Sequence, residues 1–404
     1  MTWILTSSFN GAGFCVKEGN YKMEMDATQP LKSYALVLLE KIRENAPISK
    51  RELQNITGFS WGLISRLTNE LVDASYIVSK GKVDTGVGRK PDEFDVNSEK
   101  NYFIGVDFSH RGTIIAVTDM KGCIIESCEL TWLERKKDIV LTQFFETLDC
   151  LMEKYADKNI MGIGFAAQGV VNVEKGISVY IGGIEGWNDV PFKTLVEDRY
   201  DVDAVVAHDP DCLMQCEQAF GVLKDGSATD VVLLHFVQGV SIGMSVMLNG
   251  KIYLGHHAKA GEVGHMILGK MTDGRYDFMD NHVNKVCIER DYQRLAPSAK
   301  CLTYQEIVAQ AKEGDDLCKQ VFQQICDYIA QSVAVVNSLL NPEVIVVNTV
   351  GCDYQELLMN TVEEHLRTVS YDKTVKLQLS KLGGEAKAVG AALIAIDSVM
   401  SEIL

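Results

Sequence analysis

The fold of this chain is decided by a short stretch in its second half, Ala260-Gly261-Glu262-Val263-Gly264-His265. Two glycines bracket a carboxylate, and a histidine closes the run. Glycine costs backbone entropy unless a positive φ or a close approach is needed, so the pair predicts a backbone held tightly against a ligand. A carboxylate accepts hydroxyl hydrogen bonds and an imidazole donates or accepts them, so Glu262 and His265 suit a polyol or sugar. The alternative is a surface loop that ends in a helix N-cap.

The sequence around this stretch resembles the signature segment of the ROK family (repressor, open reading frame, kinase), which groups sugar kinases with sugar-responsive repressors. The resemblance is carried by Asn249-Gly250-Lys251-Ile252-Tyr253-Leu254-Gly255, Gly186-Trp187-Asn188-Asp189-Val190-Pro191, Cys287-Ile288-Glu289 and Gly383-Gly384-Glu385-Ala386. It implies an α/β protein in which an N-terminal winged helix-turn-helix domain precedes a two-lobed actin-like ATPase (ribonuclease H-like) domain. Within the family, the chain is similar to repressors of the xylose and N-acetylglucosamine type.

Residues 31–98 show the pattern of a winged helix-turn-helix module. A helical period runs from Leu31 to Asn45, and Ser49-Lys50-Arg51-Glu52 is typical of a capping box that begins a short second helix. Thr57-Gly58-Phe59-Ser60 then provides a tight turn and an N-cap for a third helix over Trp61–Asp73. The alternative is a helical protein-interaction domain with a solvated charged loop.

In such modules the helix after the turn lies in the major groove with its N-terminal residues facing base edges. The basic, glycine-rich segment 79–91 is expected to form the wing, and Gly88-Arg89-Lys90-Pro91 is similar to the Gly-Arg-x-Pro wing of ROK repressors. Cations of a wing supply affinity more than sequence choice. The predicted DNA contacts are Lys50, Arg51, Ser60, Trp61, Ser65, Arg66, Lys80, Lys82, Arg89 and Lys90.

Two turns that bind ATP phosphates in ROK kinases are altered in this chain. The first, Asp-x-Gly-x-Thr in the family, is Asp107-Phe108-Ser109-His110-Arg111 here. The second, Gly-Thr-Gly-x-Gly, is Val237-Gln238-Gly239-Val240-Ser241. Small residues let backbone amides reach phosphates in such turns, and both turns have lost them. We therefore expect that the protein does not bind ATP as a cofactor, does not transfer phosphoryl groups and is not an enzyme.

The resemblance also implies an effector site. His208-Asp209-Pro210-Asp211 corresponds to the family's Asn-Asp-x-Asn, whose aspartate is the general base of the kinases; here only Asp209 is kept. The glycine turn at Gly169 follows Gln168, where the family normally has proline. The predicted sugar-binding residues are Gly169, Asn188, His208, Asp209, Glu262, His265 and Glu289. The alternative for the aspartates is a turn that supplies helix N-caps.

Zinc is not expected. ROK proteins usually bind it through a histidine at the position of His265 and a Cys-x-Cys-x4-Cys run, which makes a closed tetrahedral site. This chain has no cysteine between His265 and Cys287. Cys287 and Glu289 remain as the end of the run, with His282 or Asp280 as further candidate ligands. A two-ligand remnant is too weak for a structural metal.

Composition narrows the class of protein. The net charge of −16 argues against holding nucleic acid by bulk electrostatics, but residues 31–98 are nearly neutral and leave room for a basic face. No apolar run spans a bilayer and the first residues lack a signal-peptide pattern, so a cytoplasmic protein without a membrane partner is expected. The eleven cysteines lack paired spacing, as in a reducing compartment. Cys212 and Cys216 share a helix face and favour core packing over a metal site.

The chain is long enough for two or three domains. We expect a poorly ordered tail over 1–30, in which Met23 or Met25 is an alternative start, a DNA-binding domain over 31–98, a first lobe over 99–217, a second lobe over 218–385, and a helix over 386–404 that packs back on the first lobe.

These patterns predict a sugar-responsive transcriptional regulator, most simply a repressor, with operator DNA and a small sugar in the cleft between the lobes as partners. A homodimer or dimer of dimers is expected because half-sites need two DNA-binding domains at fixed spacing. Two alternatives remain. One is a ROK-type sugar kinase fused to a DNA-binding domain, motivated by Asp209. The other is a ligand-independent regulator with a decayed site, motivated by His208 and Asp211.

Overall fold

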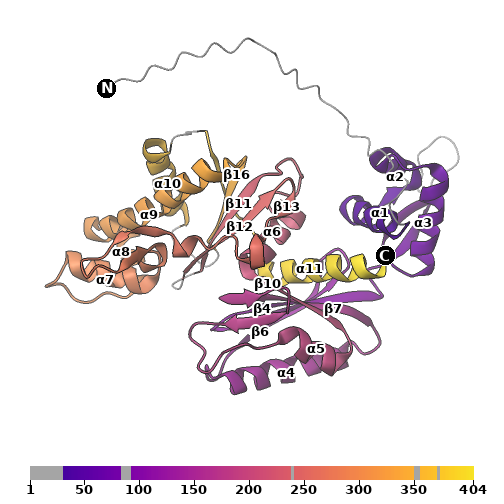
Figure 1. Cartoon of the computed structure of the whole chain (residues 1–404), viewed down its shortest axis with the longest axis horizontal. Coiled ribbons are helices and arrows are strands. Elements are labelled where there is room, and N and C mark those ends of the chain that lie inside the picture. The colour runs from indigo at the N-terminus through magenta and orange to yellow at the C-terminus, as the bar shows by residue number, and fades with distance from the viewer. Residues whose placement is uncertain (1–30, 83–91, 238–240, 350–354, 371–373) are drawn as a thin grey trace, which may run out of the picture. The chain divides into compact units, whose positions relative to one another are not determined.

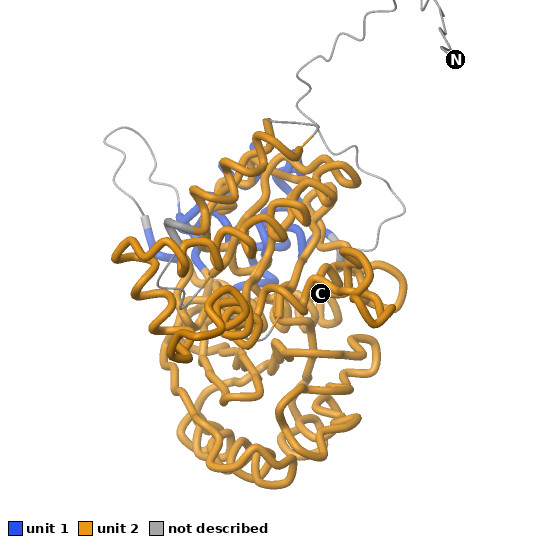
Figure 2. The backbone as a smooth tube through the Cα atoms, turned by 90° about the vertical axis from the view of Figure 1, so that its left-hand side faces the viewer, with its two compact units in different colours: residues 1–74, 79–95 blue, residues 75–78, 96–404 orange. Residues whose placement is uncertain are grey.

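The computed structural model describes residues 31–82, 92–237, 241–349, 355–370 and 374–404. The predicted tail therefore lies outside the described residues. The chain divides into two compact units, one of residues 1–74 with 79–95 and one of residues 75–78 with 96–404 (Figure 2). No helix among the described residues combines the length and the apolar character needed to cross a membrane.

The N-terminal region contains three helices and a three-stranded sheet of order β1-β3-β2. Its core is built from fully buried aliphatic side chains that include Leu38, Leu53 and Leu67, one from each helix. In chain order the elements are α1 (Leu31–Asn45), β1 (Ile48–Ser49), α2 (Lys50–Thr57), α3 (Trp61–Asp73), β2 (Ile77–Lys82) and β3 (Asp92–Val96).

The local signals predicted for this region are confirmed. Ser49 Oγ accepts a hydrogen bond from the backbone N of Glu52 at 3.3 Å, and Glu52 Oε2 accepts one from the backbone N of Ser49 at 2.9 Å. This capping box lowers the pKa of Glu52, chiefly through the Ser49 side chain. Gly58 ends α2 with a φ of +72°. Ser60 Oγ accepts from the backbone N of Leu63 and begins α3. The tight turn between α2 and α3 is therefore fixed at both helix ends.

The larger unit contains two five-stranded sheets. The first sheet has the order β10-β7-β4-β5-β6, in which β4, β7 and β10 are parallel. Its elements are β4 (Asn101–Phe108), β5 (Gly112–Asp119), β6 (Ile124–Thr131), α4 (Lys137–Lys154), β7 (Asn159–Ala167), β8 (Val170–Asn172), β9 (Ile177–Tyr180), α5 (Phe192–Tyr200), β10 (Asp203–His208) and α6 (Asp209–Phe220).

The second sheet has the order β13-β12-β11-β16-β17. The long helix α9 supplies much of its core, through side chains such as Val321, Ile329 and Val333. The remaining elements are β11 (Val231–Val237), β12 (Ser241–Leu248), β13 (Lys251–Ile252), η1 (His256–Ala258), η2 (Val263–His265), β14 (Ile267–Lys270), β15 (Tyr276–Phe278), η3 (Met279–Asn281), α7 (Lys285–Leu295), α8 (Tyr304–Glu313), α9 (Asp316–Leu340), β16 (Val344–Asn348), α10 (Gln355–Val369), β17 (Lys376–Leu379) and α11 (Ala386–Ile403).

Helices cover both faces of the first sheet (Figure 1). On one face α4 and α5 contribute Phe144 and Phe192 to an aromatic core. On the other face α11 approaches so closely that a Cβ on Gly105 of β4 would lie 1.8 Å from the carbonyl oxygen of Ala388. Cys212 is fully buried there against α11, as core packing predicts. Small residues on both partners therefore bring the last helix into contact with the strands that carry the candidate site.

Candidate functional site

The two glycines of the run Ala260–His265 pack inward. Gly261 has a φ of +92°, and a Cβ there would lie 2.1 Å from the carbonyl oxygen of Met244 in β12. A Cβ on Gly264 would lie 2.5 Å from Oδ1 of Asp280. The close approach that we expected a ligand to make is therefore made by the protein's own strand and carboxylate. The fold itself therefore requires both glycines, and a ligand held against this turn stays a prediction.

Asp280 fixes this turn. Its Oδ1 accepts a hydrogen bond from the backbone N of Ile242 at 3.1 Å, and its main-chain oxygen accepts one from Asn284 Nδ2 at 2.8 Å. Burial raises the pKa of the Asp280 carboxyl, and the Ile242 amide opposes that rise. Asp280 thus ties β12 to the glycine turn through its carboxylate, and it holds the start of α7 through its main-chain carbonyl. Glu262 and His265 remain exposed at the turn.

The carboxyl ends of β4, β7 and β10 meet at one edge of the first sheet. His208 pairs with Ala167, and Ala167 pairs with Phe108. The turn that contains Gly169 and the first turn of α6, which begins at Asp209, therefore lie at adjacent strand ends. Open α/β sheets bind ligands at this edge. Gly169 has a φ of +86°, and a Cβ there would lie 2.3 Å from a neighbouring carbonyl oxygen, so the fold itself requires this glycine.

Asp209 is only 3% exposed and lies among three basic side chains. Its Oδ1 is 3.8 Å from His208 Nε2, and its Oδ2 is 3.8 Å from Lys387 Nζ and 3.9 Å from His235 Nε2. The N-cap of α6 is His208, which makes no side-chain capping bond. The aspartates therefore do not serve as N-caps. They lie in the first turn, where the helix dipole favours negative charge.

The other predicted effector residues are spread over several elements. Asp211 is not among the predicted contacts; it accepts a hydrogen bond from Ser245 Oγ of β12 at 2.6 Å, and burial raises its pKa. Glu289 Oε1 accepts from the first backbone N of α8 at 2.8 Å, so one of its oxygens already stabilises a helix end. Asn188 is exposed. Within the described ranges no hydrogen bond or ion pair links Asn188 or Glu289 to the other predicted effector residues.

The residues present do not fit a structural zinc ion. Among the described residues, no group of three or more histidine, cysteine or acidic side chains is placed to hold a metal. His282 Nε2 lies 2.8 Å from Asp277 Oδ2, and Asp280 is bonded to the Ile242 amide. The backbone N of Cys287 donates to Asn284 Oδ1, the N-cap of α7. The side chains of His282 and Asp280 are thus engaged in separate local contacts.

The first phosphate turn does not fit a nucleotide either. The backbone N of Ser109 donates to the Gly112 carbonyl at 3.0 Å, and that of Arg111 donates to Ser109 Oγ at 3.3 Å. Gln168 Oε1 accepts from the backbone N of His110 at 3.1 Å and lies 2.9 Å from its Nδ1. Three backbone amides of this turn are therefore bonded within the protein. The centre of the second turn lies outside the described residues.

Helix α3 presents a polar exposed face. Trp61 is 53% exposed, and Arg66 forms an ion pair with Glu70 at 2.9 Å. Lys50 Nζ reaches this face from α2, 3.5 Å from Ser65 Oγ and 3.4 Å from Asn69 Oδ1. Asn69 is not among the predicted DNA contacts, although it lies one helical turn beyond Ser65 on the same face of α3 and an i, i+4 period indicates it.

The remaining predicted DNA contacts fall into four groups. Arg51 and Lys80 are exposed, and Lys80 Nζ lies 3.9 Å from Asp95 Oδ2. Ser60 is exposed, but its hydroxyl is occupied as the N-cap of α3. Lys82 is the last residue of β2. Arg89 and Lys90 lie outside the described residues, so their position stays a prediction.

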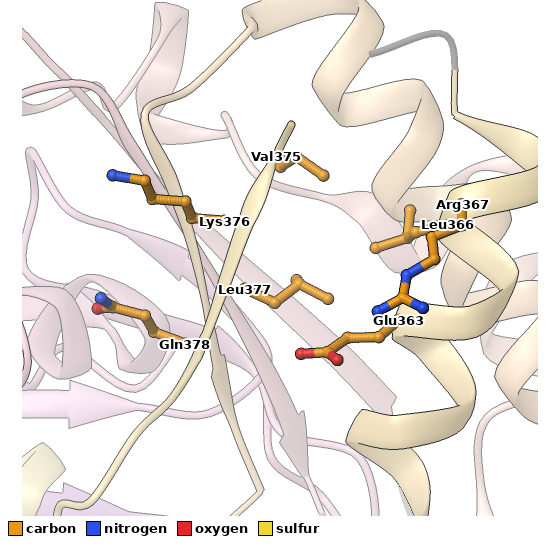
Figure 3. Close-up of a pocket in the computed structure, with 7 residues that line it drawn as sticks. All are labelled: Glu363, Leu366, Arg367, Val375, Lys376, Leu377 and Gln378. Atoms are coloured by element: carbon orange, nitrogen blue, oxygen red, sulfur yellow. The ribbon is translucent and has the colours of Figure 1, made fainter. Parts of the chain in front are cut away.

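A cavity of about 410 Å³ lies away from these residues, between α10 and β17 (Figure 3). Val375 and Leu377 point toward α10, whereas Lys376 and Gln378 point to the other side of the strand. No predicted site residue lines this cavity. The lining residues are Glu363, Leu366, Arg367, Val375, Lys376, Leu377 and Gln378.

Comparisons with known proteins agree with this architecture. The model of the ROK family matches residues 103–398. A xylose repressor of Caldicellulosiruptor bescii is 22% identical over 387 residues, which cover 91% of this chain and 96% of that protein. A ROK family transcriptional regulator, homolog of the E. coli MLC protein, superimposes with a TM-score of 0.79 at 23% identity, covering 92% of this chain and 97% of that one.

A kinase shares the fold over a shorter range. The ROK family glucokinase from Streptomyces griseus, solved with glucose and AMPPNP, has a TM-score of 0.61 at 19% identity and covers 73% of this chain and 99% of its own. The predicted fold class, an N-terminal helix-turn-helix domain followed by a two-lobed actin-like domain, is confirmed by these matches.

Proposed function

The chain belongs to the ROK family, and from that premise we propose that it is a sugar-responsive transcriptional repressor without phosphoryl-transfer activity. One combination carries the proposal. A helix-turn-helix with both helix starts capped precedes an actin-like domain whose first phosphate turn has three amides bonded within the protein. A DNA-binding regulator needs the helix-turn-helix. A kinase needs the amides of the phosphate turn free to bind phosphate. The relative named xylose repressor supports the same function.

The DNA contacts are assigned to α3 and the wing. Arg66 and Asn69 have the side chains that bind guanine and adenine edges most specifically in the major groove, and Lys50 and Ser65 flank them. Arg89 and Lys90 are proposed to contact phosphates. On this assignment the exposed residues of α3 set sequence choice, and the wing adds affinity that salt weakens.

The effector contacts are assigned to the two sheets together. Gly169 and Asp209 belong to the edge of the first sheet, while Glu262 and His265 lie on the turn after β13. Burial of Asp209 supplies a fixed acceptor, and the exposed pair supplies groups that can reorient. A sugar that bonds to both sets stabilises one arrangement of the two sheets over others. Asn188, His208 and Glu289 remain proposed contacts of the same sugar.

Signalling then follows from differential affinity. The effector shifts the population toward the conformation that it binds better. The resulting change in DNA affinity cannot exceed the ratio of the effector's affinities for the two conformations, typically about 5- to 150-fold. A homodimer in the cytoplasm is proposed, because paired half-sites need two DNA-binding domains at a fixed spacing.

A thermal-shift assay tests effector binding. Xylose, glucose, N-acetylglucosamine, N-acetylmannosamine and their phosphates are titrated against the full chain, since a ligand of the folded state raises Tm. At one hundred times its Kd such a ligand adds about 2.7 kcal/mol. The variants Glu262→Gln and Asp209→Asn should lose the shift, whereas Glu174→Gln, an exposed carboxylate away from the site, should keep it. The absence of any shift across the panel would favour a regulator with a decayed site.

The sugar-kinase alternative rests on Asp209 and on the shared fold with a glucokinase. It predicts sugar-dependent ADP release in a coupled assay with MgATP. Because three amides of the first phosphate turn are bonded internally, we expect no turnover above that of Asp209→Asn. Turnover that depends on Asp209 would overturn the proposal.

A further inference from the structure

Four side chains from four elements meet where α6 and α11 connect the two sheets (Figure 1). We call Asp107 of β4, Asp209 of α6, His235 of β11 and Lys387 of α11 the junction cluster. Lys387 Nζ lies 2.9 Å from Asp107 Oδ1 and 3.8 Å from Asp209 Oδ2. Asp107, Asp209 and His235 are 7%, 3% and 5% exposed, so their charges are held away from water.

His235 does not neutralise Asp209. Asn348 Nδ2 donates to Ser380 Oγ at 2.9 Å, so Asn348 Oδ1 is left as the acceptor that lies 2.9 Å from His235 Nδ1. The proton of a neutral His235 must therefore sit on Nδ1, and Nε2 presents a lone pair toward Asp209. Burial, with a smaller effect of Lys387, lowers the pKa of His235 to about 4, so the ring is uncharged near neutral pH.

The cluster thus holds two carboxylates and one ammonium. Buried carboxylates need a paired cation or several hydrogen bonds to stay ionised. In the described part of the chain, Asp107 Oδ1, Asp209 Oδ2 and His235 Nε2 make no hydrogen bond of good geometry. The ammonium of Lys387 is therefore the group within 4 Å that can offset both negative charges.

We propose that Lys387 is an internal counter-ion that holds Asp107 and Asp209 together, so that the junction of the two sheets is assembled without a bound cation or nucleotide. The lysine binds β4 and the first turn of α6 to the start of α11. It also sets the position of Asp209, the buried carboxylate proposed above as an effector contact. The inference itself concerns the unliganded protein and does not depend on which effector binds.

Other titratable groups around Lys387 do not replace it. Cys212 lies on α6, and burial raises its pKa well above the ordinary value, so it stays a neutral thiol. His208 faces Asp209 at 3.8 Å from the opposite oxygen. Burial alone would lower the pKa of Lys387, but Asp107 and then Asp209 outweigh it and the pKa is raised. The ammonium therefore persists throughout the pH range in which the protein is handled.

The test is urea unfolding of the full chain from pH 5 to pH 8. Lys387→Met keeps the aliphatic stem and removes the charge, leaving two buried carboxylates uncompensated. Burial raises the pKa of the Asp107 carboxyl. Above that pKa we expect the urea midpoint of Lys387→Met to lie below the parent's, and a matching thermal scan should show a Tm about 5–15 °C lower. The loss should shrink as pH falls, because a protonated Asp107 needs no counter-ion. Lys154→Met, which breaks the exposed pair with Glu126, is the matched control and should change the midpoint little.

A double-mutant cycle identifies the partner. Asp107→Asn should reduce the effect of Lys387→Met, since residues in one ion pair are not additive and only Asp209 is then left without its counter-ion. A loss in Lys387→Met that is independent of pH and unchanged in the Asp107→Asn background would overturn the inference, because the lysine would then act only through packing of its stem. Unchanged stability in Lys387→Met would overturn it equally. Neither result bears on whether a sugar binds.

Discussion

Replacing Asp280 by alanine should destabilise the larger unit and weaken effector binding together. The substitution removes the acceptor for the backbone N of Ile242, a residue that is 4% exposed. A hydrogen bond to a charged group contributes about 1.5–3 kcal/mol, and a buried donor left without a partner costs about as much. Relief of the buried carboxylate offsets part of this, so we expect a net loss of about 2 kcal/mol and a fall in Tm of about 3–6 °C.

Asp280→Asn is the matched control, because an amide oxygen can still accept from Ile242. It should lie within about 1 kcal/mol of the parent. Differential scanning fluorimetry gives the Tm of both Asp280 variants, and a sugar titration gives their sugar Kd. Because the turn that carries Glu262 and His265 rests on Asp280, Asp280→Ala should raise the sugar Kd about tenfold, the factor that corresponds to 1.4 kcal/mol. Equal stability of the alanine and asparagine variants would refute the role assigned to this carboxylate.

Three further predictions concern packing, capping and DNA recognition. Gly390→Ala should destabilise the protein by several kcal/mol in urea unfolding, because its Cβ would lie 1.7 Å from the Cys212 carbonyl oxygen. Gly62→Ala has open space around it and should stabilise α3 by about 0.5–1 kcal/mol. Similar effects of the two substitutions would contradict the close packing of α11. Ser60→Ala should cost about 1 kcal/mol through the lost cap of α3, and a Tm equal to the parent's would count against that cap. In gel shifts at several salt concentrations, Arg89→Ala should weaken all operators alike and Arg66→Ala should relax sequence choice; identical profiles for both variants would argue against the assignment to α3 and the wing.

Local signals of the N-terminal region were sufficient to place its helices. The capping box at Ser49, the left-handed Gly58 and the N-cap at Ser60 each depend on residues three or four positions apart. A third helix over Trp61–Asp73 was predicted with the bounds that the structure has. Such signals are visible in sequence because both partners of each hydrogen bond lie in the same short window.

Contacts between distant segments were not predictable in the same way. The pattern at Gly261 indicated a close approach but not that β12 makes it. The pairing of Lys387 with Asp107, and the closing of the first phosphate turn by Gln168, join residues far apart in the chain. The altered turn suggested that phosphate would be blocked by side chains, whereas the structure adds that its amides are already bonded. Family resemblance supplied the candidate effector residues, but not the bond that engages Glu289.

The most direct test of the central claim is footprinting on DNA upstream of the protein's own coding region, with and without each sugar and with MgATP. We predict a protected, two-fold symmetric site whose occupancy changes at least fivefold with one sugar and is unaffected by MgATP. No protection at low salt, or a sugar effect that appears only when MgATP is present, would contradict the account.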